Sequence, residues 1–302
     1  MKSRLVISLV LLFVFKNIHA QSAPLVVASI KPIHSIVSSL MEDVAIPELL
    51  LQSNNSAHTF HLKPSQISVI ENASLVISIS DEFEIGLRKA LKNLDESTRF
   101  EITKLDNLKI HKYRADKIYE IEHQEQHSHE AVTNDMHLWL DIDNMKKIAN
   151  HIHLLLIDID PINQHKYNQN LELLTSKLDT LHIELENQML PFSSKIYATY
   201  SDTVQYFEKK YNIGRPVIVT PYHGARLSIN RTLASKNTMN NLEASCLFYG
   251  NEVRKSKVSV LSEGLNLKTA KIDILGQDIN PGPDLYSKLM KKISNQIASC
   301  LE

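Results

Sequence analysis

The sequence predicts an α/β protein with two parallel-sheet lobes joined by one long helix. In both halves of the chain, short runs rich in β-branched residues alternate with amphipathic helical patterns, which is typical of parallel βαβ units. Between the halves, residues 162–189 carry the longest helical periodicity in the sequence. The chain has 302 residues, 43% of them hydrophobic and 22% charged, so its composition is globular and its length allows two domains.

The first twenty residues have the pattern of a secretory signal peptide. Lys2 and Arg4 form a basic start, residues 5–15 are apolar, and residues 18–20 offer a cleavage site. The apolar run is shorter than the roughly 20 residues that span a bilayer, and Lys16 interrupts it. We therefore expect an exported protein rather than a membrane-anchored one.

Strands and helices alternate through the first half after this segment. We expect, in order, a strand over residues 25–30, a helix opened by Pro32, a strand over 46–51, a helix opened by Pro64, a strand over 74–80 and a helix over 86–94. A further helix begins near Asn144, because Met145, Ile148 and Ile152 fall on one face of it.

A polar segment rich in histidine interrupts this pattern at residues 111–130. It contains four histidines and four glutamates, namely His111, His123, His127, His129, Glu120, Glu122, Glu125 and Glu130. Such a composition cannot build a packed core, so the segment predicts a solvated loop.

Residues 162–189 predict a helix roughly 40 Å long. Its apolar residues are spaced alternately four and three apart: Tyr167, Leu171, Leu174, Leu178, Leu181 and Leu185. A coiled coil is the alternative, but fewer than four heptads and no regular flanking charge pairs favour packing within one molecule. We expect this helix to be a spine between the lobes, ended by Pro191.

The second half repeats the α/β theme. Candidate strands cover residues 195–200, 216–220, 245–248, 258–261 and 269–275. We therefore divide the chain into a signal peptide (1–20), an N-terminal lobe (21–160), a connecting helix (161–190) and a C-terminal lobe (191–302).

The two cysteines predict one disulfide. Cys246 falls in a candidate strand and Cys300 near the chain end, and an exported protein meets an oxidising environment. Their separation fits neither a CxxC redox motif nor a zinc knuckle, so we expect a structural bond that fastens the last helix to the second lobe.

Composition and motifs argue against two classes of function. With 33 basic and 34 acidic residues, a formal net charge of −1, the chain has no basic field with which to bind nucleic acid. A metal-dependent hydrolase is also disfavoured, because the sequence contains no HExxH or GxSxG motif. We therefore expect a binding protein rather than an enzyme.

Two of the fourteen histidines lie where an α/β protein places ligand groups, on loops that follow strands. His58 precedes the helix opened by Pro64, and His137 precedes the helix near Asn144. No short spacing such as HxxxH couples the two histidines, so their sequence positions alone leave both a ligand role and a purely structural role open.

Five ordered motifs span the chain after the signal peptide: SIKPIHS at 29–35, AHTF with KPS at 57–65, HLWLD at 137–141, QYFEKKY at 205–211, and IDILG with PGPDLY at 272–286. Together they resemble the zinc and manganese substrate-binding proteins of bacterial ABC importers, and most closely the zinc-uptake branch. The resemblance implies a periplasmic, monomeric receptor with a metal cleft between its lobes. It implies Zn²⁺ as the ligand, with Mn²⁺ as the alternative, and a membrane ABC permease as the partner.

The same resemblance assigns residues to the metal. His58 and His137 match the first and second metal-binding histidines of the family, and Asp273 matches an acidic residue that lies near the metal. Neutral imidazoles suit Zn²⁺, and a carboxylate adds compensating charge. Taken alone, Asp273 would be a strand-end cap or turn residue. The segment 111–130 stands where zinc-type members carry a metal-collecting insertion, which implies accessory capture by His123, His127 and His129; a merely polar loop is the alternative.

Two departures mark a divergent member. Ser201 replaces the third histidine of the family, and a hydroxyl is a poor zinc ligand. Water could complete a weaker site, Asp202 or His61 could replace the missing ligand, or metal binding could be lost. The Glu-Pro-Gln segment of the family is likewise replaced, here by residues 250–252. The second hypothesis is therefore an accessory or interaction paralogue that keeps the fold without tight metal binding.

Overall fold

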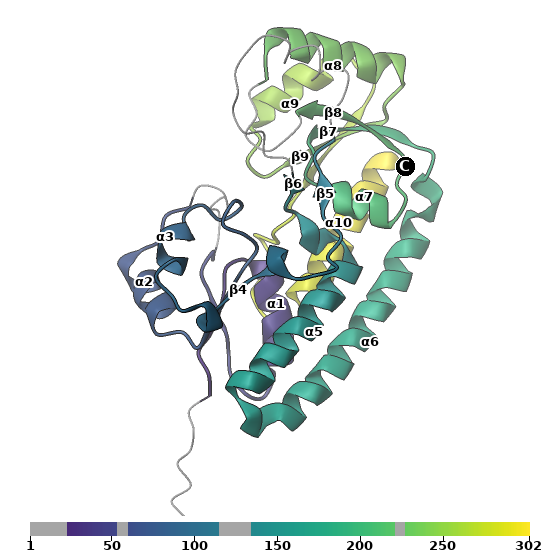
Figure 1. Cartoon of the computed structure of the whole chain (residues 1–302). Helices are drawn as coiled ribbons and strands as arrows, with labels where there is room; N and C mark the ends of the chain where they lie inside the picture. The colour runs from purple at the N-terminus through teal and green to yellow at the C-terminus, as the bar shows by residue number, and fades with distance from the viewer. Residues whose placement is uncertain (1–22, 53–59, 115–133, 221–226) are drawn as a thin grey trace, which may run out of the picture.

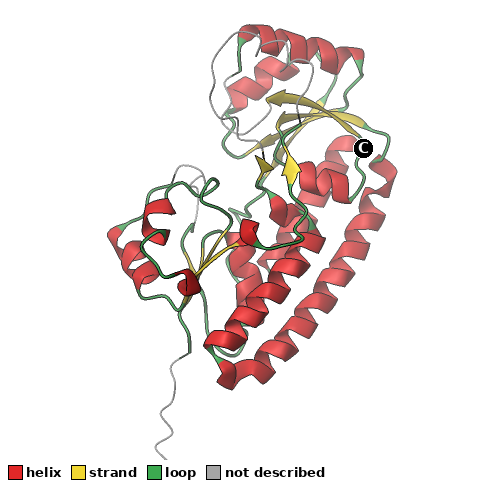
Figure 2. Ribbon diagram, in the orientation of Figure 1, coloured by secondary structure: helices red, strands yellow, loops and turns green. Residues whose placement is uncertain are grey.

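The computed structural model describes residues 23–52, 60–114, 134–220 and 227–302. Two four-stranded parallel sheets lie in separate lobes, and two long helices run side by side along one side of the molecule (Figures 1 and 2). The predicted fold class is therefore confirmed. The predicted signal peptide, His58, His123, His127 and His129 lie outside the described residues. In the described ranges, no helix has both the length and the apolar character needed to cross a bilayer.

The N-terminal sheet has the strand order β2-β1-β3-β4. Its strands are β1 (Val26–Ala28), β2 (Glu48–Leu49), β3 (Leu75–Ser78) and β4 (Arg99–Glu101). Helices α1 (Lys31–Leu40), α2 (Pro64–Glu71) and α3 (Arg88–Leu91) connect them. Both α1 and α2 have proline in their first turn, where the missing N–H costs no hydrogen bond.

A two-stranded antiparallel hairpin and the two long helices follow. The hairpin pairs β5 (His111–Lys112) with β6 (Asn134–Asp135), and it leads through the 3-10 turn Leu138–Leu140 into α5 (Ile142–Ile159). The 26-residue α6 (Gln164–Met189) is the predicted connecting helix. Its buried residues include Tyr167, Leu174, Leu178, Leu181 and Leu185, which confirms the predicted face.

The C-terminal sheet has the order β10-β9-β7-β8. Its strands are β7 (Ile196–Ser201), β8 (Arg215–Thr220), β9 (Cys246–Gly250) and β10 (Lys268–Ile272). Helices α7 (Gln205–Lys210), α8 (Ile229–Asn241), α9 (Lys255–Ser262) and α10 (Leu285–Leu301) complete the lobe. Side chains alternate between two apolar cores: Tyr197, Cys246 and Phe248 join the main core, whereas Ala198 and Leu247 join a smaller one with α8 and α9 residues.

Two local expectations were wrong. Residues 258–261 form part of helix α9 rather than a strand, because Val258 and Leu261, three residues apart, are the buried pair while Val260 is exposed. The expected loop at 111–130 begins with strand β5 instead. Its partner β6 lies more than twenty residues further along the chain, so no local pattern announces the pairing.

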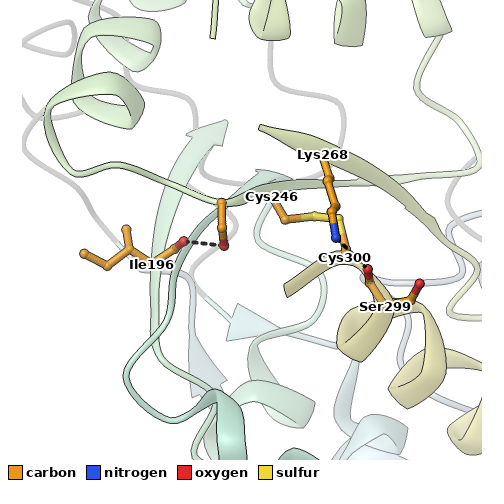
Figure 3. Close-up of a disulfide and its surroundings, with 6 residues drawn as sticks. Ile196, Cys246, Lys268, Ser299 and Cys300 are labelled. Carbon is orange, nitrogen blue, oxygen red and sulfur yellow. Dashed lines mark hydrogen bonds between the residues drawn. A yellow bond between two sulfur atoms is a disulfide. The ribbon is translucent and has the colours of Figure 1, made fainter. Parts of the chain in front are cut away.

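The predicted disulfide is present. Cys246 in β9 is bonded to Cys300 in α10, with their Cα atoms 5.8 Å apart (Figure 3). Close to it, the Lys268 ammonium donates to the Ser299 carbonyl at 3.4 Å. The bond therefore holds the end of the last helix against the C-terminal sheet.

Reduction of this disulfide should lower the free energy of unfolding by about 2–4 kcal/mol, because the crosslink restricts the unfolded chain. Urea denaturation with and without reductant measures the difference. A Cys246→Ala, Cys300→Ala double variant should match the reduced protein and be insensitive to reductant. An oxidised and a reduced wild type with the same midpoint would contradict the expectation.

Candidate metal site

His137 is oriented by a buried carboxylate. It directly follows Met136 at the end of the hairpin, and its side chain is almost completely buried. The ring Nδ1 lies 2.7 Å from Asp135 Oδ1, which also accepts the backbone N–H of His137 at 3.0 Å. A neutral imidazole that donates through Nδ1 carries its lone pair on Nε2, the form in which histidine binds a metal.

Two aromatic rings pack against the His137 imidazole. Phe83 and Trp139 meet it edge-on, with ring centroids 5.8 and 5.3 Å away. Phe83 lies in the segment that follows β3, so the carboxyl end of the N-terminal sheet reaches this histidine. The packing restricts the ring and excludes water from its faces.

The segment that carries Phe83 is held by a buried carboxylate. Glu84 Oε2 accepts the backbone N–H groups of Ile79 and Ser80 at 2.8 and 3.0 Å. Burial raises the pKa of Glu84 to about 7, and the two donated N–H groups offset only part of that shift. Glu84 therefore changes charge near neutral pH.

Asp273 organises the turn that follows β10. Its Oδ1 accepts from the amides of Leu275 and Gly276 at 3.2 and 3.0 Å, and its Oδ2 accepts from the Gln277 amide at 2.6 Å. Lys292 of α10 lies 3.7 Å from Oδ2. Gly276 has φ +69°, which a residue with a side chain rarely adopts. In this structure Asp273 is thus a turn cap, the role that its sequence position suggests when taken alone.

The turn at Asp273 lies against the His137 segment. The indole N–H of Trp139 donates to the Ile274 carbonyl at 2.9 Å. The buried ammonium of Lys31 donates to the carbonyls of Gly276, Gln277 and Ile279 in the same turn at 2.9–3.0 Å. The structure therefore brings together two segments that are 135 residues apart in sequence.

The region of the missing third histidine contains a buried ion cluster. Ser201 ends β7, and its neighbour Asp202 is completely buried. Arg114 binds Asp202 through its guanidinium and backbone N–H, and its Nη2 also lies 2.6 Å from Glu208. Burial raises the pKa of both carboxyl groups, and Arg114 counteracts that shift. In this structure Asp202 is therefore already paired with the guanidinium of Arg114.

The remaining candidate ligands are not assembled in the part of the chain that the structure describes. There, no three His, Cys, Asp or Glu side chains are grouped to hold a metal. His61 is exposed. His58 lies outside the described ranges, but Phe60, two residues later, is buried and its carbonyl closely approaches Gly86, in the segment that also carries Phe83.

Sequence reasoning missed the residues that support His137. Asp135 precedes the histidine by two positions, and this Asp-x-His spacing was the available signal. Arg114 carried no signal, because Asp202 and Glu208 are close to it only in the folded chain. Glu84 bonds to backbone groups four and five positions earlier, but no motif marked it in the sequence.

Comparison with known proteins decides the family. The sequence profile of the family described as "Zinc-uptake complex component A periplasmic" (ZnuA) matches residues 26–300. The chain belongs to this family. Members of the ZnuA family are uptake binding proteins, so this chain is a binding protein and not an enzyme.

Relatives and solved structures agree over nearly the whole chain. The "High-affinity zinc uptake system protein ZnuA" of Brucella abortus is 29% identical, and that of Yersinia pestis 26%, over 91% and 92% of this chain and 91% of each relative. A crystal structure of ZnuA superposes with a TM-score of 0.76 at 20% identity, covering 93% of this chain and all of that one. The Pseudomonas aeruginosa protein FpvC in complex with Mn²⁺ superposes with the same score at 14% identity, over 92% of this chain and 98% of that one. These two structures share the ZnuA fold with this chain.

Glu84 should make stability depend on pH. The unfolded carboxyl ionises near pH 4.5, whereas the folded one keeps its proton to about pH 7. The contribution of Glu84 is therefore full at acid pH and is lost as pH rises through this window, by about 3 kcal/mol in total. A Glu84→Gln variant, which keeps an acceptor oxygen, should lack this loss in urea denaturation at pH 5 and pH 8, whereas the exposed Glu71→Gln should retain it. An unchanged pH slope in Glu84→Gln would contradict the assignment.

Proposed function

We propose that this protein is an exported receptor that binds Zn²⁺ between its lobes and delivers it to an ABC permease for uptake. The observation that carries the proposal is His137, which is buried and oriented by Asp135, in a segment whose Trp139 bonds to the turn of Asp273. We assign the metal to His58, His137 and Asp273, with water completing the coordination. Zinc is held by imidazole and carboxylate ligands in such sites.

The chemistry of the donor set favours zinc over manganese. Two neutral imidazoles and one carboxylate form a nitrogen-rich set, whereas Mn²⁺ prefers oxygen ligands. The described fold supports a role for Asp273, because its turn lies against the His137 segment through Trp139. We propose that Asp273 contributes negative charge beside the metal while continuing to cap its turn.

We also propose accessory capture of metal by His123, His127 and His129. The hairpin strands β5 and β6 flank these positions in sequence, and β6 ends two residues before His137. Clustered imidazoles raise the local concentration of metal near the entry to a stronger site. The proposal also includes export of the chain to the periplasm and function as a monomer. It places the two lobes at residues 21–160 and 191–302.

An accessory paralogue without tight metal binding is the second candidate. Ser201 favours it, since this strand-end position carries no imidazole. A Ser201→His variant distinguishes the two. A large gain in zinc affinity, with thermal stability retained, would show that the geometry of a three-histidine site persists. No gain in a folded variant would show that the site has been rebuilt, as expected for a paralogue with another role.

The receptor should bind one Zn²⁺ with high affinity. Calorimetric titration of the metal-free protein without residues 1–20 measures it, and Trp139, next to His137, gives a parallel fluorescence signal. His58→Ala and His137→Ala should each weaken binding at least 100-fold, whereas His165→Ala, an exposed histidine of α6, should not. Affinity should fall toward pH 5 as the imidazoles protonate. Weak multiple binding that survives His137→Ala would overturn the proposal.

A further inference from the structure

Helix α7 places a row of buried polar side chains against the hairpin. Its first four residues are Gln205, Tyr206, Phe207 and Glu208, and all four are at most 2% exposed. Three of them, Gln205, Tyr206 and Glu208, bear polar groups that form hydrogen bonds when buried. The helix belongs to the C-terminal lobe, yet it packs against the 3-10 turn that follows His137.

The hydroxyl of Tyr206 joins the two strands of the hairpin. It donates to the Asp135 carbonyl at 2.7 Å and accepts the His111 backbone N–H at 3.0 Å. His111 and Asp135 are directly opposite each other in the hairpin register. The Tyr206 ring also packs on the His111 imidazole, with centroids 4.7 Å apart. One phenol thus fixes both strands at the pair that includes Asp135.

The amide of Gln205 separates two buried carboxylates. Its Nε2 lies 3.4 Å from Asp135 Oδ2 and 3.3 Å from Asp202 Oδ2, and it donates to the Lys112 carbonyl at 3.1 Å. The reverse orientation of the amide would point an oxygen at three acceptors, so the contacts determine the orientation. Without this donor the two carboxylates would face each other in a site that excludes water.

The ion cluster holds the other end of the hairpin to the same helix. Arg114, two residues after β5, binds Asp202 just before α7 and Glu208 within it. Removing one partner of such a buried cluster would leave an uncompensated charge, so the cluster couples the position of Arg114 to that of α7. Strand β5 is therefore attached to α7 through Arg114, and strand β6 through Asp135.

We propose that Gln205 and Tyr206 are positioning residues for His137. They act through Asp135. The Tyr206 phenol fixes the backbone of Asp135, and the Gln205 amide fixes Oδ2 of its carboxylate. Oδ1 of Asp135 then accepts the Nδ1–H of the His137 imidazole and orients the ring. The Nε2 lone pair is thereby aimed at the metal. This inference rests on the proposed function only in assigning a metal to His137. It gives the Gln-Tyr-Phe-Glu motif a role, since a C-terminal helix holds a ligand of the N-terminal half.

The metal-free protein allows the first test. In proton NMR, the hydrogen-bonded Nδ1–H of His137 should give a downfield signal that His137→Gln removes. Tyr206→Phe and Gln205→Leu should broaden or shift this signal. Tyr249→Phe is the matched control, because Tyr249 lies on β9 and makes no hydrogen bond to the hairpin in the described structure. An unchanged signal in both Tyr206→Phe and Gln205→Leu would overturn the inference.

Zinc affinity provides the second test. Loss of a residue that orients a metal-bound histidine typically costs 10- to 100-fold in affinity, so we expect a loss of that size in both variants and none in Tyr249→Phe. Thermal melting checks that the variants remain folded. Altered NMR signals with wild-type zinc affinity would overturn the link to the metal. If the wild type does not bind Zn²⁺, the proposed function is wrong. The Nδ1–H signal alone then tests whether Gln205 and Tyr206 position His137.

Discussion

The site depends on the way the first turn of α10 is held between two distant parts of the chain. The backbone N–H of Tyr286 donates to the Ser35 hydroxyl of α1, and the Tyr286 phenol donates to the Trp139 carbonyl, both at 2.9 Å. Beside them, Lys31 binds three carbonyls of the turn that Asp273 caps. These contacts join residues that are 147 to 251 positions apart, and they hold the turn of Asp273 and the segment of Trp139 against the same helices.

The apolar core explains why these polar contacts are stable. α10 buries Leu289, Met290, Ile293 and Ile297 completely, against α1, α6 and β10. Each such side chain contributes roughly 1.5–3 kcal/mol relative to full exposure. The Lys31 ammonium is buried with this packing, which lowers its pKa, although Asp273 and Asp278 oppose the shift. Three carbonyl acceptors replace the water that the ammonium has lost.

A second buried polar system connects Asp135, the hydrogen-bond partner of His137, with helix α7. Asp135, Asp202 and Glu208 are carboxylates at 0–2% exposure, and Arg114 is the cation bound to two of them. Burial raises the pKa of Asp202 and Glu208, and the Arg114 guanidinium counteracts that shift in both carboxyl groups.

The sequence by itself determined the class of fold, the long helix and the disulfide, because each rests on local periodicity or on simple counting. Leucine spacing fixed the buried face of α6, and two cysteines in an exported chain left one pairing within it. The ordered motifs made His137 and Asp273 candidate ligands. Local spacing also bears on two contacts, because Asp273 caps its own turn and Asp135 bonds to His137 only two positions later. The tertiary structure decided that α7 holds the hairpin: the Tyr206 hydroxyl bonds to the backbone of His111 and Asp135, 95 and 71 positions away, and no local pattern encodes such contacts.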